Sequence, residues 1–195
     1  MLTKIFKNNF YRSVILVLGF SLCFAVNHAY GQDTLPEKFI NLLQKSGMSV
    51  NIPDSFKVVP VMENKQMNYD YAVKHVSKDL EIRYAIRPDD PNTSAMYAAI
   101  FVADLANISG KPASAELASS VKILPKESVS KEFNADWAAF AMMKPANEFG
   151  EGYDFCAVVA IHKNNKGDGY IFCLSHVHQD IGPMLKTAFD SLTFK

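Results

Sequence analysis

Apolar and polar residues alternate along two neighbouring segments of the chain, residues 67–76 and residues 80–87. A period of two predicts half-buried antiparallel strands, and the short link between the segments makes them a hairpin. Because alternate side chains share a face, the charged residues of the second strand lie together. These residues are Glu81, Arg83 and Arg87. We expect this face to be solvated and to carry cross-strand ion pairs.

Helices are predicted at several further places, from apolar residues that recur every three or four positions and from capping residues, prolines and glycines at the expected ends. The helices are expected over residues 35–46, 93–108, 125–133 and 182–191. The second of these is apolar on nearly all sides, so it either packs on two sides within the domain or contacts a partner. We favour packing within the domain. Further strands are expected over residues 48–52, 135–143, 153–163 and 169–178.

The order of these elements is helix, strands, helices, strands, helix, with hairpins between neighbouring strands. This order predicts an α+β fold in which an antiparallel sheet is flanked by helices. The sequence contains no internal repeat, no low-complexity tract and no linker. Residues 32–195 are therefore expected to form one domain of ordinary size.

The first 31 residues have the pattern of a cleaved signal peptide. A start with three basic and no acidic residues precedes an apolar run over residues 13–26, and Ala29-Tyr30-Gly31 provides a small-x-small cleavage site. The alternative is an uncleaved anchor, but the run is shorter than the roughly 20 residues of a spanning helix. A lipoprotein signal at Cys23 is disfavoured because bulky Leu22 precedes it. We expect export to the periplasm or the extracellular space, with no transmembrane segment in the mature chain.

Removal of this segment changes the charge of the protein. The whole chain has 20 basic and 20 acidic residues, and three basic residues leave with the signal peptide, so 17 basic and 20 acidic residues give a net charge of −3. A mildly acidic domain without runs of Lys or Arg lacks the basic surface that holds a phosphate backbone. Nucleic acid is therefore not an expected partner.

One polar cluster is a candidate metal site. If residues 165–167 form the turn between the strands 153–163 and 169–178, Cys156 faces His176 and Asp154 faces His178. A thiol, two imidazoles and a carboxylate are a ligand set that zinc accepts, for a metal carrier or a metal-dependent hydrolase. The simpler alternative is that these are ordinary polar groups with hydrogen-bond partners, and we favour it.

The same turn decides whether Cys156 and Cys173 form a disulfide, which an oxidising compartment permits. A turn over residues 165–167 places the two cysteines on opposite faces of the sheet, whereas a two-residue turn over 164–165 places them opposite each other. Gly167 favours the first turn, with the glycine in a left-handed conformation. We therefore predict two buried free thiols.

Three short pieces of the chain resemble the PsbP-like superfamily. They are residues 48–56, which read as a strand followed by proline and an aromatic residue, the start of a strand at Asn134-Ala135-Asp136-Trp137, and a Ser-Leu-x-Phe ending within residues 189–194. The resemblance implies an α/β/α sandwich. It also implies a mostly non-catalytic class that includes a photosystem subunit, a nuclear-transport factor and bacterial envelope proteins, with no set of catalytic residues to transfer.

The sequence lacks the common motifs of catalysis. It has no Gly-x-Ser-x-Gly elbow, no His-Glu-x-x-His, no Gly-x-Gly-x-x-Gly and no phosphate-binding loop. Together with the resemblance, this favours a non-enzymatic exported domain that binds a partner protein or a small apolar ligand in the bacterial envelope. No cofactor is expected other than zinc at the site above, and the sequence predicts no oligomeric state.

Overall fold

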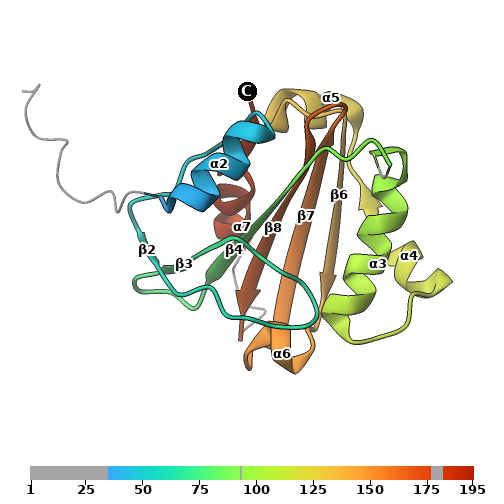
Figure 1. Ribbon diagram of the computed structural model, residues 1–195. Helices are drawn as coiled ribbons and strands as arrows, with labels where there is room; N and C mark the ends of the chain where they lie inside the picture. Colours follow the sequence, from blue (N-terminus) through green and yellow to red (C-terminus); the bar gives the residue numbers. More distant parts are fainter. Residues whose placement is uncertain (1–34, 93, 177–181) are drawn as a thin grey trace, which may run out of the picture. The chain divides into compact units, whose positions relative to one another are not determined.

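Seven antiparallel strands form the main sheet of the computed structural model, which describes residues 35–92, 94–176 and 182–195 (Figure 1). In spatial order they are β2 (Phe56–Val58), β3 (Tyr71–His75), β4 (Glu81–Pro88), β8 (Gly167–Ser175), β7 (Phe155–Lys163), β6 (Trp137–Met143) and β5 (Lys122–Ile123). A second sheet pairs β1 (Met48–Val50) with β9 (Leu192–Phe194). The prediction of an α+β fold with an antiparallel sheet is confirmed.

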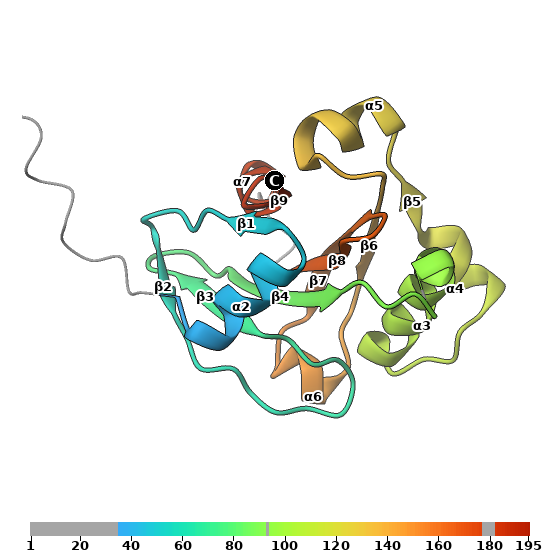
Figure 2. The ribbon, with the colours of Figure 1, turned by 45° about the horizontal axis from the view of Figure 1, so that its top comes forward.

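Helices lie on both faces of this sheet. They are α2 (Glu37–Lys45), a 3₁₀ turn (Ser94–Met96), α3 (Tyr97–Ser109), α4 (Ala115–Ser120), α5 (Lys126–Ser128), a π-helical turn (Val129–Phe133), α6 (Asn147–Gly150) and α7 (Gly182–Phe189). Figure 2 shows α7, β1 and β9 on one side of the strands and α6 on the other. Two hydrophobic cores result. The first lies under α2, α7 and the small sheet, and the second lies under α3 and α6.

The apolar helix α3 is explained by its surroundings. Phe101, Leu105 and Ile108 point into the second core, and α4 contacts the helix from another direction. Its exposed positions are mainly alanines, among them Ala98 and Ala103. Packing within the domain, as expected, therefore accounts for a helix with few polar side chains.

The turn between β7 and β8 differs from both turns considered above. Lys163 pairs with Gly167, so residues 164–166 form the turn, and Asn165 takes the left-handed conformation (φ 60°). Gly167 has φ 120° and packs against β4, where a Cβ atom would lie 2.1 Å from the carbonyl oxygen of Arg87. Gly167 is therefore required because two strands approach each other closely there, and it is not part of the turn. The predicted register assumed that it was, and that register was wrong.

This register places the two cysteines on opposite faces of the sheet. Cys156 lies opposite Leu174 and belongs to the second core, whereas Cys173 lies opposite Ala157 and belongs to the first. Both thiols are free and buried. The prediction of two buried free thiols is therefore confirmed, although it was reached through a different pairing.

The expected signal peptide, residues 1–31, lies outside the described residues, and it stays a prediction. Residues 35–195 cluster as one compact unit. Within the described part of the chain, none of the helices has the length and apolar character needed to cross a bilayer.

Candidate functional site

The charged face of β4 is covered. Glu81 and Arg83 are only 8% and 0% exposed, so the expectation of a solvated face is wrong for this half of the strand. Tyr69 from the loop that precedes β3, together with Phe149 from α6, packs over Arg83. Alternation along a strand identifies residues that share a face, but it carries no information on whether another layer covers that face.

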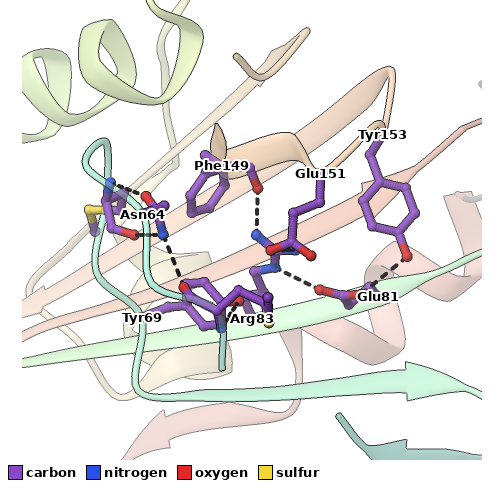
Figure 3. Close-up of polar contacts among 9 residues, drawn as sticks. Asn64, Tyr69, Glu81, Arg83, Phe149, Glu151 and Tyr153 are labelled. Atoms are coloured by element: carbon purple, nitrogen blue, oxygen red, sulfur yellow. Dashed lines mark hydrogen bonds and ion pairs between the residues drawn. The ribbon is translucent and has the colours of Figure 1, made fainter. Parts of the chain in front are cut away.

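Arg83 is held by groups from three parts of the chain (Figure 3). Its Nε donates a hydrogen bond to Glu81 Oε1 at 2.7 Å, and its Nη1 donates to the carbonyl oxygen of Phe149. Nη2 lies 3.1 Å from Glu151 Oε1, an ion contact without hydrogen-bond geometry. The guanidinium also lies 4.6 Å from the ring centre of Tyr69 and 5.2 Å from that of Phe149. Pairing of this kind is what a buried charge requires.

Two tyrosines extend the network. Tyr153 donates its hydroxyl hydrogen to Glu81 Oε2 at 3.1 Å, and the hydroxyl oxygen of Tyr69 accepts a hydrogen bond from the Met62 backbone at 2.8 Å. Burial raises the pKa of both phenols above the usual value. Both groups therefore stay protonated at neutral pH, and Tyr153 acts as a hydrogen-bond donor.

At the other end of the same face, Arg87 makes a bidentate ion pair with Asp104 of α3. The nitrogen–oxygen distances are 2.7 and 3.1 Å, and Tyr170 donates its hydroxyl hydrogen to the same carboxylate at 2.8 Å. The guanidinium lies 4.9 Å from the ring centre of Tyr170. Burial lowers the pKa of Arg87 and is the largest single influence, but the hydrogen bond to Asp104 and the nearby acidic groups together outweigh it, and the net pKa is raised.

An open cleft of about 610 Å³ lies beside this ion pair, which is within the size range of small-ligand sites. One wall is the loop of residues 64–68, the floor is residues 85–87 of β4, and the other wall is formed by Asp104 and Asn107 of α3. The side chain of Asn64 holds the loop in shape, because its Oδ1 accepts backbone hydrogen bonds and its Nδ2 donates to a carbonyl.

The charges that line the cleft cancel. Lys65 and Arg87 are balanced by Asp70 and Asp104. Asp104 is engaged by Arg87, and Asp70 accepts a hydrogen bond from the backbone of β4 at 2.9 Å. What the cleft offers to a ligand is therefore a set of amide groups with little net charge. These are the side chains of Gln66, Asn68 and Asn107.

A buried histidine braces the wall formed by α3. His162 is 1% exposed, and its Nδ1 lies 2.8 Å from Asp168 Oδ1 while its Nε2 lies 3.3 Å from Asn164 Oδ1. Its ring stacks on Tyr97, the first residue of α3, at 4.1 Å between centres. Burial lowers the pKa of His162 and is the largest single influence, but the hydrogen bonds to Asp168 and Asn164 and the nearby carboxylate charges together raise it by more, so the net pKa is raised. Asp168 also lies opposite Arg87 in the sheet. His162 of β7, Asp168 of β8 and Arg87 of β4 are therefore neighbours across three adjacent strands.

The residues of the predicted metal site are placed differently from the expectation. Cys156 faces Leu174 and not His176, and burial raises its thiol pKa to about 12. Asp154 forms an ion pair with Lys144 at 2.9 Å. His176 bonds through Nδ1 to Asp79 at 2.9 Å. Its ring lies 4.5 Å from that of Tyr153.

His178, the fourth expected ligand, lies outside the described residues. Among the residues that are described, no group of three or more His, Cys, Asp or Glu side chains is arranged to hold a metal ion. The pairing on which the zinc site was built is wrong, and the site itself stays a prediction.

Two important residues were missed in the sequence although each left a signal. Asp104 is the one acidic residue of helix α3, and it falls on the stripe formed by Phe101, Leu105 and Ile108. His162 likewise stands at the end of an apolar strand. A charged or polar residue at a position that the pattern marks as buried indicates a specific partner.

Comparison with protein-family models, with curated proteins and with solved structures finds no match to this chain. The resemblance to the PsbP-like superfamily therefore stays a prediction beyond the α+β architecture.

Proposed function

We propose that the protein is an exported, non-catalytic domain that binds a small uncharged ligand rich in hydroxyl or amide groups. The ligand lies in the polar cleft between the loop of residues 64–68, β4 and α3. Saccharides and short capped peptides share the required chemistry. This proposal replaces an apolar ligand, because polar side chains dominate the lining of the cleft.

The observation that carries the proposal is the bidentate ion pair between Arg87 and Asp104 in the cleft wall. An arginine that already holds a carboxylate in this geometry has little remaining attraction for an anion. The amides of Asn68 and Asn107 both donate and accept hydrogen bonds, which suits hydroxyl and amide groups of a ligand. Both residues are exposed and accessible.

Calorimetric titration tests this proposal with two probes, chitotriose and N-acetyl-alanyl-alanine amide. We expect saturable binding of one probe or both. Each of the variants Asn68→Ala and Asn107→Ala should weaken it about tenfold, the effect of losing about 1.4 kcal/mol of hydrogen bonding. Asn51→Ala is the matched control, because Asn51 is exposed and lies beyond the end of β1, away from the cleft.

The proposal fails if neither probe binds, or if the control variant weakens binding as much as the cleft variants do. The separate arms for saccharide and peptide distinguish the two sources of the same chemistry. Binding to a partner protein stays a prediction of the sequence.

A further inference from the structure

We propose that the guanidinium of Arg83 is a binding site for a small carboxylate, and that Glu151 occupies this site in the structure as an internal substitute. The site lies at the opposite end of β4 from Arg87 and shares no lining residue with the polar cleft. Its ligand is a monocarboxylic acid, supplied either as a free organic acid or as the carboxyl end of a short peptide.

The guanidinium is fixed in a way that leaves one edge for a ligand. Nε is used by Glu81 and Nη1 by the carbonyl oxygen of Phe149, while the rings of Tyr69 and Phe149 hold the group from the sides. Nη2 is buried and makes no hydrogen bond to any of the described residues, and it lies 3.1 Å from a carboxylate oxygen of Glu151. Figure 3 shows the side chain of Glu151 extending toward the guanidinium of Arg83, beside Glu81. A carboxylate with free choice of orientation forms better hydrogen bonds to such an edge.

Glu151 differs from Glu81 in ways that favour its release. The side chain of Glu151 is 36% exposed, against 11% for Glu81. Its backbone is left-handed, with φ 48°, at the end of the four-residue helix α6. Gly152 follows with φ 93° and open space around it. A non-glycine residue in this conformation is strained, and strain of this kind gathers at ligand sites and switch segments.

The chemistry of the site selects a singly charged carboxylate. When Glu151 moves into water and a ligand carboxylate takes its place, the charge beside Arg83 is unchanged. A phosphate dianion would add a further negative charge next to Glu81, which like-charge repulsion disfavours. The aromatic rings of Tyr69 and Phe149 flank the position and suit a short hydrocarbon tail.

The test uses propionate, with propionamide as the uncharged control and N-acetylalanine to represent a peptide carboxyl end. We expect propionate, and not propionamide, to shift the backbone NMR signals of Glu151 and Gly152 saturably in the unmodified protein. In Glu151→Ala the affinity should rise at least about tenfold, because the ligand no longer competes with a tethered carboxylate. Comparison with N-acetylalanine shows which source of the carboxylate is preferred.

Glu148→Ala is the matched control, since Glu148 lies in the same short helix but contacts the backbone of Lys65 and not Arg83. It should leave propionate affinity unchanged, whereas Arg83→Met should abolish binding. If Arg83→Met does not fold, the comparison of Glu151→Ala with Glu148→Ala decides the matter. Binding that appears only in Glu151→Ala, or equal effects of propionate and propionamide, would overturn the proposal and leave Glu151 as a permanent structural partner.

Discussion

The carboxylate of Asp104 joins helix α3 to the central sheet, and its replacement by Asn tests the cleft wall most sharply. Asp104 accepts hydrogen bonds from both terminal nitrogens of Arg87 and from the hydroxyl of Tyr170. Asn has the same shape, but it directs an NH₂ group at one of these donors and removes the charge. Tyr170 is 2% exposed, so its hydroxyl has little access to water as a substitute.

The expected loss in the free energy of unfolding follows from how exposed Tyr170 and Arg87 are to water. A buried hydroxyl that loses its acceptor costs about 1–3 kcal/mol. The loss at Arg87 is smaller, about 1 kcal/mol or less, because its side chain is 38% exposed and water replaces part of the interaction. We therefore expect Asp104→Asn to lower the free energy of unfolding by about 2–3 kcal/mol. At roughly 2–4 °C per kcal/mol for a chain of this size, the melting temperature falls by about 4–12 °C.

Urea denaturation of four proteins measures this effect: the unmodified chain, Asp104→Asn, Tyr170→Phe and the double variant. If the hydroxyl and the carboxylate act together, the cost of Asp104→Asn should be smaller by about 1 kcal/mol when Tyr170 is already Phe. A cost below about 0.5 kcal/mol, the range of ordinary surface substitutions, would refute the reasoning. So would strict additivity of the two substitutions.

Three further predictions concern other parts of the fold. Because the net pKa of His162 is raised through Asp168, its stabilisation is complete below the unfolded pKa of about 6.5 and is lost as pH rises through the folded value. Unfolding measured across this range should show that loss in the unmodified protein and not in His162→Gln, and a rise of stability with pH from this group would contradict the assignment. Cys156, buried with a raised pKa, should react with a thiol reagent only at the rate of unfolding, and fast labelling of the folded protein would show that the core is open. Gly167→Ala should destabilise by about 3 kcal/mol or more because its methyl group meets the β4 backbone, whereas Gly152→Ala, also at positive φ but in open space, should cost only about 1 kcal/mol, and equal melting temperatures for the two variants would count against the close packing.

The parts of the fold that could be predicted are those in which a periodic pattern of apolar residues extends over many positions. The alternation along β4 and the helical spacing in α2 and α7 extend far enough for a period to be recognised. The helices α4 and α6 have only six and four residues, which is too short for a period of 3.6 to stand out. Their places in the chain were accordingly not predicted as helices.

The strand register could not be obtained from the turn sequence alone. Gly167 fits the rule for a glycine in a hairpin turn, yet the structure requires it there because β4 approaches closely. That contact joins residues about 80 positions apart in the chain, and no local pattern reports it. The register error then misplaced the pairing of Cys156 with His176.

Only part of the candidate site could be predicted from the sequence. The strand that carries Arg83 and Arg87 was identified, together with the fact that they share a face. That face is covered by the loop around Tyr69, which the alternation had assigned to a strand, and by the segment around Phe149, which has no periodic pattern. The difference between a solvated face and a buried charged network therefore depends on contacts that only the folded chain defines.

Whether the polar cleft holds the ligand is tested by a backbone amide NMR spectrum of the protein with saturating chitotriose or N-acetyl-alanyl-alanine amide. We expect the perturbed signals to gather on residues 64–68 and on Asp104 and Asn107, which line the cleft. Perturbation confined to the opposite face of the sheet, under α2 and α7, would contradict it.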